Sequence, residues 1–166
     1  AILIGLWIYD ELSFNQNHKH YDRIVQVLRK DMDDGLIEVN SSMVSKLGVY
    51  LDETYPTLFD NVSMTFYRNQ EQFLKVGERS VERFGYFFSK DVNELLQLDF
   101  VAGSTFDESE KYVILLSQSL AKTLFVDENP VGKSLSINNS VDLFVSGVYK
   151  DLPQNSTFQD MEYIIP

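Results

Sequence analysis

The sequence predicts an α+β fold with mixed strand pairing. Two patterns in its 166 residues indicate this class: short alternating or continuous apolar runs, typical of strands, and segments with apolar residues three and four positions apart, typical of helices. Turn residues separate these segments, and no internal repeat or low-complexity stretch divides the chain. We therefore expect one domain, which buries about 70% of its unfolded surface.

The first strands should form a hairpin. Residues 23–30 contain four aliphatic side chains and favour a strand. Asp33, Asp34 and Gly35 supply a turn, and residues 37–39 give a second short strand.

A helix and a strand should follow this hairpin. Ser41 and Ser42 are typical N-cap residues, and Pro56 ends the helix because the residue before a proline is driven out of the helical region. The residues on its apolar face would be Val44, Leu47 and Leu51. Residues 62–67 alternate apolar and polar side chains, which predicts a half-buried strand.

The middle of the chain predicts two strands and a short helix. Residues 73–84 read as two strands that meet at Gly77 and Glu78. Residues 91–94 resemble a capping box, the sequence pattern that opens a helix. The residues that this helix would turn inward are Val92, Leu95 and Leu96.

The last third has the clearest local signals. Residues 112–116 form a continuous apolar strand, Ser117 is a good helix cap, and Asn129-Pro130 ends the helix. The buried face of this helix would be Leu120, Ala121, Leu124 and Phe125. Strands at residues 135–137 and 141–149 would then flank a turn at Asn138 and Asn139.

Composition excludes several classes of function. Fourteen Lys and Arg against 25 Asp and Glu give a net charge of −11, so the clustered positive charge that nucleic-acid binding requires is absent. The chain has no cysteine, which removes disulfides, thiolate metal sites and cysteine nucleophiles together.

Residues 1–9 read AILIGLWIY, an uncharged apolar run followed at once by Asp10 and Glu11. Nine helical residues span about 14 Å, whereas a bilayer core is about 30 Å thick. One interpretation is the outer half of a transmembrane helix, with Trp7 and Tyr9 at the membrane interface. The other is a buried core segment, and the pattern leaves both open.

Four groups of residues are candidates for a chemical site, and we expect no catalytic, cofactor or metal site from any of them. Gly132-Lys133-Ser134 lacks the earlier glycine of a phosphate-binding loop, and its helix precedes it instead of following. His18 and His20, with acidic residues nearby, complete no zinc spacing. The acidic group Asp107, Glu108 and Glu110 lacks the alternating ligands of a calcium loop.

The fourth group is aromatic. Phe84, Tyr86, Phe87 and Phe88 surround Gly85. They are expected in the core, with a ligand groove as the alternative.

Three stretches, in order, resemble the MacB-like periplasmic core domain of ABC-transporter permeases (MacB/FtsX-type permeases). Residues 8–27, IYDELSFNQNHKHYDRIVQV, are similar to the family's exit from its first transmembrane helix. Residues 116–135, LSQSLAKTLFVDENPVGKSL, and residues 145–166, VSGVYKDLPQNSTFQDMEYIIP, resemble its later motifs. Residues 30–110 match mainly by pattern.

This resemblance implies a bilobed α+β domain. Residues 1–12 would end the first transmembrane helix, residues 21–75 and 140–166 would form a porter-like lobe of strand-helix-strand units, and residues 76–139 would form an inserted second lobe of mixed α/β structure.

The resemblance also implies a function that is not enzymatic. The chain would be the periplasmic domain of an inner-membrane permease, coupling ATP-driven motion of the transmembrane helices to a substrate or partner in the envelope. Its partners would be the helices of the same permease, a cytoplasmic ABC ATPase, a second permease in a dimer, and a periplasmic adaptor or substrate. The alternatives are a membrane-tethered ligand-binding or sensor domain and, third, an envelope hydrolase that uses His18 or His20.

Overall fold

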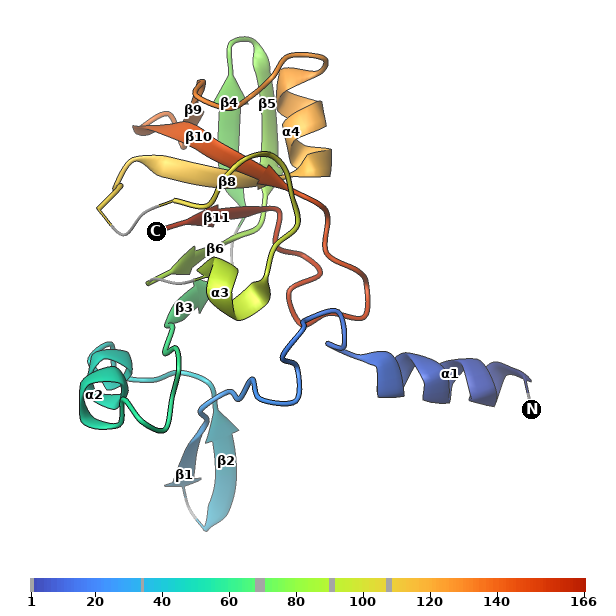
Figure 1. Ribbon diagram of the computed structural model, residues 1–166, viewed down its shortest axis with the longest axis vertical. Coiled ribbons are helices and arrows are strands. Elements are labelled where there is room, and N and C mark those ends of the chain that lie inside the picture. Colours follow the sequence, from blue (N-terminus) through green and yellow to red (C-terminus); the bar gives the residue numbers. More distant parts are fainter. Residues whose placement is uncertain (1, 34, 68–70, 90–91, 107–108) are drawn as a thin grey trace.

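The computed structural model describes residues 2–33, 35–67, 71–89, 92–106 and 109–166. Within these ranges the helices are α1 (Ile2–Ser13), α2 (Leu47–Thr54), α3 (Val92–Leu96) and α4 (Gln118–Phe125). The strands are β1 (Arg29–Asp33), β2 (Leu36–Asn40), β3 (Thr65–Tyr67), β4 (Gln72–Val76), β5 (Arg79–Arg83), β6 (Gly85–Phe88), β7 (Phe100–Gly103), β8 (Val113–Ser117), β9 (Ser134–Ile137), β10 (Val141–Tyr149) and β11 (Tyr163–Ile165). The predicted α+β class is confirmed (Figure 1).

One sheet holds nine of these strands. Its order is β3-β6-β11-β8-β10-β9-β4-β5, with β7 paired to β10 beside β9. The pairs β10–β8 and β11–β6 are parallel, and the other pairs in this sheet are antiparallel. The pairing is therefore mixed, as the sequence predicted.

The sheet separates two hydrophobic cores because side chains alternate between faces along a strand. On β8, Ile114 and Leu116 join the core that packs against α4, whereas Leu115 joins the core that contains α3. Both cores draw their described side chains from residue 74 onward.

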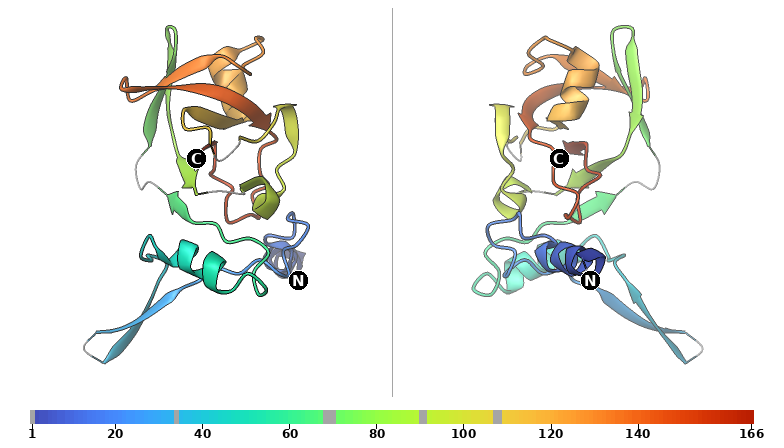
Figure 2. Two further views of the ribbon diagram at one scale, coloured as in Figure 1. Left: turned by 60° about the vertical axis from the view of Figure 1, so that its left-hand side comes forward. Right: turned by 90° about the vertical axis from the view of Figure 1, so that its right-hand side faces the viewer.

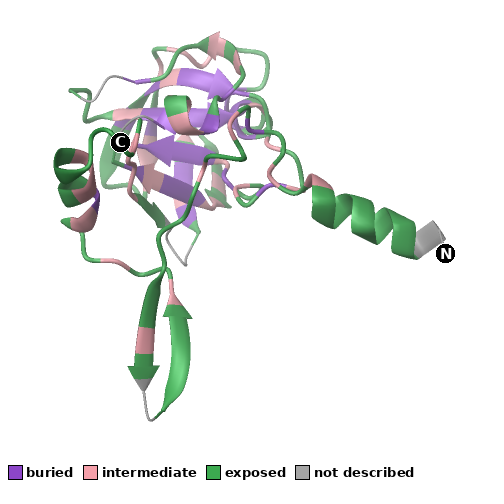
Figure 3. Ribbon diagram, turned by 60° about the horizontal axis from the view of Figure 1, so that its bottom comes forward, coloured by how far each residue is buried: buried purple, intermediate pink, exposed green. Residues whose placement is uncertain are grey.

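Residues before the sheet form a separate region. The hairpin β1–β2 and helix α2 project from one end of the molecule in both views of Figure 2. The hairpin has a polar face, with Arg29 and Asn40 hydrogen-bonded to Asp31, and an apolar face that contains Met32, Ile37 and Val39. These three apolar side chains are exposed, and Figure 3 shows most of the hairpin in the colour of exposed residues.

Several predicted elements are confirmed and their ends corrected. The two predicted hairpins are β1–β2 and β4–β5, and the helix capped by Ser117 is α4. The strand predicted at residues 23–30 begins only at Arg29, and the helix predicted from Ser41 begins at Leu47. Nothing in the described part of the chain packs over Val25 or Val44, so neither has the burial that its apolar pattern predicted.

Other corrections concern burial and strand ends. The strand predicted at residues 62–67 is limited to β3, whose Phe66 is exposed. Helix α4 ends at Phe125, before Asn129-Pro130, because Val126 has a left-handed φ of 57°. The proposed cap Asp91 lies outside the described residues.

The lobe boundaries stay a prediction, and the described sheet is continuous across them. Strands β4 and β10 come mainly from the ranges assigned to the porter-like lobe. Strands β5, β8 and β9 come from the range assigned to the inserted lobe, yet they are hydrogen-bonded neighbours of β4 and β10.

Candidate functional site

Among the described residues, the apolar side chains of helix α1 from Ile4 to Leu12 are largely exposed. The helix extends away from the body of the molecule (Figure 1), and Ile4, Leu6, Trp7, Ile8, Tyr9 and Leu12 are between 45% and 73% exposed. An isolated helix that is apolar on all sides is unfavourable in water. Taken over the described residues, however, no helix combines the length and the hydropathy needed to cross a bilayer.

A cluster of polar side chains fixes the end of α1 to the loop between β10 and β11, and we call it the junction. Asn15 donates its backbone N–H to the carbonyl oxygen of Asn155 at 2.7 Å. Its side chain exchanges two hydrogen bonds with Thr157, each 2.8 Å long. Asn155 Nδ2 donates to the hydroxyl and the carbonyl oxygen of Ser13, at 2.9 and 3.1 Å. The junction therefore joins residues 142 positions apart in the chain.

The backbone of the junction suits asparagine. Asn15 has a left-handed φ of 59°, a conformation that asparagine adopts more readily than most residues. The chain can thus turn sharply after α1 and still present both the Nδ2 donor and the Oδ1 acceptor of the Asn15 side chain to the loop.

His18 attaches the same segment to α3. Its ring is 4% exposed, and Nδ1 lies 3.0 Å from the carbonyl oxygen of Leu96. Because a carbonyl oxygen only accepts, Nδ1 carries the proton, and Nε2 accepts from the Asn17 amide at 3.4 Å. His20 instead meets Arg23, with Nη2 donating to Nδ1 at 2.8 Å.

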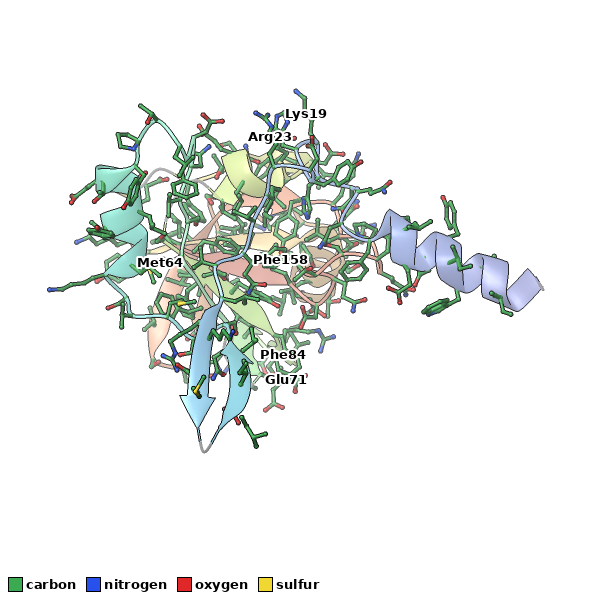
Figure 4. The ribbon with its side chains drawn as sticks, turned by 90° about the horizontal axis from the view of Figure 1, so that it is seen from below. Lys19, Arg23, Met64, Glu71, Phe84 and Phe158 are labelled. Carbon is green, nitrogen blue, oxygen red and sulfur yellow. The ribbon has the colours of Figure 1, made fainter. Side chains whose placement is uncertain are left out.

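The β10–β11 loop is in turn anchored to the core. The Phe158 ring packs edge-on against Tyr86, with 5.5 Å between the ring centroids, and its centroid lies 5.9 Å from that of Phe88. In Figure 4, Phe158 lies among the side chains of the sheet, whereas Lys19 and Arg23 project outward. Displacing Asn155 or Thr157 would therefore act on Phe158 and the aromatic side chains of β6.

The start of this loop also caps α4. Asp151 accepts from the backbone N–H of Ser119 at 3.1 Å and from its hydroxyl at 2.7 Å. A carboxylate at this position satisfies a free N–H and interacts favourably with the helix dipole. The loop thus contacts α1 and α4, two elements far apart in the chain.

Two groups at the borders of this loop, Tyr149 at the end of β10 and Glu162 just before β11, have shifted pKa values. Tyr149 is fully buried and donates its hydroxyl to the carbonyl oxygen of Met161 at 2.8 Å, and burial raises its pKa well above the usual value. Burial also raises the pKa of Glu162, although the ion pair with Arg83 at 2.7 Å opposes this shift. Both groups hold the loop against the sheet.

The structure separates the other sequence candidates. His18 and His20 have different partners, and in the described ranges no group of three His, Asp or Glu side chains is placed to hold a metal ion. Gly132 and Lys133 form a turn after α4, and Ser134 begins β9. Asp107 and Glu108 lie outside the described residues, and Glu110 is exposed.

The aromatic group belongs mainly to the core. Tyr86 and Phe88 on β6 are members of the core that contains α3, and Phe87 packs against the other core. The expected core role is confirmed for these residues, whereas Phe84 lies just before the strand and is half-buried.

Sequence reasoning did not identify the pairing of Asn15 with Asn155 and Thr157. In the sequence these residues belong to two separate motifs, residues 8–27 and 145–166. The signal available in the sequence was the presence of an Asn in each motif, since local patterns carry no information about contacts across 142 positions.

Comparisons with known proteins agree with this architecture. No curated protein sequence matches significantly. Three solved structures resemble the fold. The periplasmic region of MacB from Actinobacillus actinomycetemcomitans has a TM-score of 0.52 and 23% identity, with 64% of this chain and 48% of that chain covered. The extracellular domain of the noncanonic ABC-type transporter YknZ from Gram-positive bacteria has a TM-score of 0.52 and 19% identity, with 63% and 52% covered, and a domain of a protein described as a permease from Porphyromonas gingivalis has a TM-score of 0.59 and 18% identity, with 72% and 55% covered.

The chain spans about half the length of each of these structures. At these identities the likeness establishes the fold alone. The sequence pattern of the MacB-like periplasmic core domain, however, matches residues 1–166, the whole chain. The chain therefore belongs to the family of MacB-like periplasmic core domains.

Proposed function

We propose that this chain is the extracytoplasmic domain of an ABC-type permease and transmits motion between a membrane-embedded helix and the domain core. The observation that carries the proposal is the junction: five hydrogen bonds, none longer than 3.1 Å, join the end of α1 to the β10–β11 loop. The exposed apolar surface of α1 supports its insertion into a membrane.

The arrangement suits mechanical coupling because the loop that binds α1 is itself held by further contacts. The loop is fixed to β6 through Phe158 and to α4 through Asp151. A displacement of α1 would thus be passed through these contacts to β6 of the sheet and to helix α4.

The partners follow from this function. They are the transmembrane helices of the same permease, a cytoplasmic ABC ATPase, a second permease in a dimer, and a periplasmic adaptor or substrate. We place the domain on the periplasmic side of the inner membrane. No enzymatic step is part of the proposal, because coupling requires only that motion be transmitted.

The first test measures the stiffness of the junction. Because the chain has no cysteine, spin labels can be placed at Glu11→Cys and Ser140→Cys without background labelling. We expect one narrow distance distribution, which Asn155→Ala and Thr157→Val broaden because they remove the side-chain bonds to Ser13 and Asn15. The matched control is Thr105→Val, an exposed threonine outside the junction.

The second test uses the parent permease with its ATPase. Asn155→Ala should reduce transport, or the coupling of ATP hydrolysis to transport, severalfold, while the Thr105→Val variant keeps the original ratio. Unchanged distance distributions together with unchanged coupling would show that the junction serves stability only. A parent gene that encodes no further membrane spans would favour the alternative, a membrane-tethered ligand-binding or sensor domain.

A further inference from the structure

His18 has the only buried side chain among the described residues before Gln72. Its exposed fraction is 4%, whereas the large apolar side chains of α1, the β1–β2 hairpin and α2 are exposed or half-buried, and both hydrophobic cores begin at Leu74. Burying an imidazole removes its polar nitrogens from water, so each nitrogen needs a partner in the protein. The contacts of His18 therefore show where the segment after α1 is attached to the body of the molecule.

The partner of His18 is the C-terminal end of α3. Nδ1 lies 3.0 Å from the carbonyl oxygen of Leu96, the last residue of the helix. Such terminal carbonyl groups have no N–H partner within their own helix. The next residue, Gln97, has a left-handed φ of 51° and turns the chain away. The Nδ1–H of His18 therefore supplies a hydrogen bond that α3 cannot supply itself.

Helix α3 leads from this hydrogen bond into one hydrophobic core. Val92 and Leu96 are 1% and 3% exposed, and they belong to the core that also contains Tyr86 and Phe88. Phe158, which anchors the β10–β11 loop, packs against the same core. The junction and His18 thus connect the end of α1 to one core by two separate routes.

The hydrogen bonds of the two histidines require opposite tautomers. A neutral imidazole has one N–H and one acceptor nitrogen. In His18 the carbonyl oxygen of Leu96 requires the proton on Nδ1, whereas in His20 Nδ1 accepts from the Arg23 guanidinium, which leaves the proton on Nε2. These are the only two histidines of the chain, so each serves as a reference for the other.

We propose that His18 is a positioning residue that makes α3 a receiver of the motion of α1. It acts through the carbonyl oxygen of Leu96, and it requires an N–H donor at the δ position of the side chain. This inference rests on the proposed coupling function and extends it, because it names a receiving element besides the β10–β11 loop. A displacement at the end of α1 would then move Val92 and Leu96 relative to the aromatic rings of β6.

The first experiment determines the tautomers. Long-range ¹H–¹⁵N NMR spectra of the 166-residue chain, labelled at its histidines, are recorded at about pH 8, where an unperturbed imidazole is neutral. We expect the proton of His18 on Nδ1 and that of His20 on Nε2, and the His20→Gln variant assigns the two patterns. A proton on Nε2 of His18, or averaging over both nitrogens, would overturn the proposal because neither is compatible with a lasting bond to Leu96.

The second experiment measures the distance between α1 and α3. Spin labels at Glu11→Cys and Glu94→Cys, both at exposed positions, should give one narrow distribution. His18→Phe keeps an aromatic ring without the donor and should broaden this distribution. His18→Asn places an amide N–H at the δ position and should keep the natural width. The matched control is His20→Phe, which should leave the width unchanged.

The outcomes separate this inference from the proposed function. A broad Glu11–Glu94 distribution in the natural chain, or equal widths in all His18 variants, would exclude the role of His18, and a narrow Glu11–Ser140 distribution would then leave the junction as the only connection. Broad distributions for both label pairs would contradict the coupling function as well. If His18→Phe loses the NMR dispersion of the folded chain, His18→Gln decides: its donor lies beyond the δ position, so a width as narrow as that of His18→Asn would overturn the proposal.

Discussion

Glu162 shows at the scale of one residue how burial and pairing compete. The carboxylate lies 2.7 Å from Arg83, yet its pKa is raised, because burial disfavours the charged form more than the guanidinium favours it. Asp151 and Glu71 add like charge and push the pKa in the same direction. Glu162, just before β11, is therefore a carboxylate whose burial cost is not fully offset by its ion pair with Arg83.

This shift predicts a pH dependence of stability. A carboxyl group with a raised pKa in the folded state contributes stability below its unfolded pKa, roughly 4.3, and loses that contribution as pH rises through the folded value. The unfolding free energy of the natural chain should therefore fall relative to Glu162→Gln between about pH 4 and pH 7, by less than about 1 kcal/mol because the side chain is partly exposed. Urea unfolding of both proteins at both pH values measures the difference, and a difference of the opposite sign would contradict this account.

At the scale of the element, α4 shows how local and distant residues share one helix end. Ser117, which precedes the helix, accepts from the N–H of Leu120 at 3.2 Å, and Asp151, in the loop after β10, accepts from Ser119. The first cap could be predicted from sequence because cap and helix are adjacent. The second could not, because it depends on the parallel pairing of β8 with β10.

Removing the distant cap measures how much it contributes to the unfolding free energy. Asp151→Ala should lower the unfolding free energy by about 1 kcal/mol, the usual effect of losing a capping side chain. Asp142→Ala, at an exposed aspartate on β10, is the control and should change stability by less than about 0.5 kcal/mol. Equal effects of the two substitutions would mean that Asp151 acts only through general charge.

The same distinction explains which elements the sequence predicted. The β4–β5 hairpin and α4 carry their signals within a dozen residues, so their existence was predicted correctly. Strands β6, β7 and β11 were not predicted, because each is short and its burial depends on partners distant in the chain. Residues 41–46 had good local helix signals, but α2 begins only at Leu47, and Lys46 takes the N-cap position without a side-chain cap hydrogen bond.

At the scale of the whole molecule, exposed apolar side chains are most frequent in the N-terminal part of the described chain. Residues from 74 onward bury most of their large apolar side chains in two cores, whereas α1, the β1–β2 hairpin and α2 expose most of theirs. This unequal distribution agrees with a domain attached to a membrane at α1, and the candidate site lies where the attachment meets the fold.

Membrane association can be followed without a label, because Trp7 is the only tryptophan of the chain. Adding lipid vesicles should shift its fluorescence to shorter wavelength and protect it from an aqueous quencher, since the indole moves from water into the interfacial region. Leu6→Asp should reduce the shift, because a charge in this helix opposes insertion. An unchanged spectrum at saturating lipid would contradict insertion of α1.

Strand β11 has a consequence for the order in which the protein is made. It lies between β6 and β8, so Tyr163–Ile165 is the strip that joins the two parts of the sheet. A ribosome releases these residues after every other strand, and until then β6 and β8 have an empty position between them. The sheet can therefore close only after nearly all of this sequence has been synthesised, and its earlier strands must stay soluble while they wait.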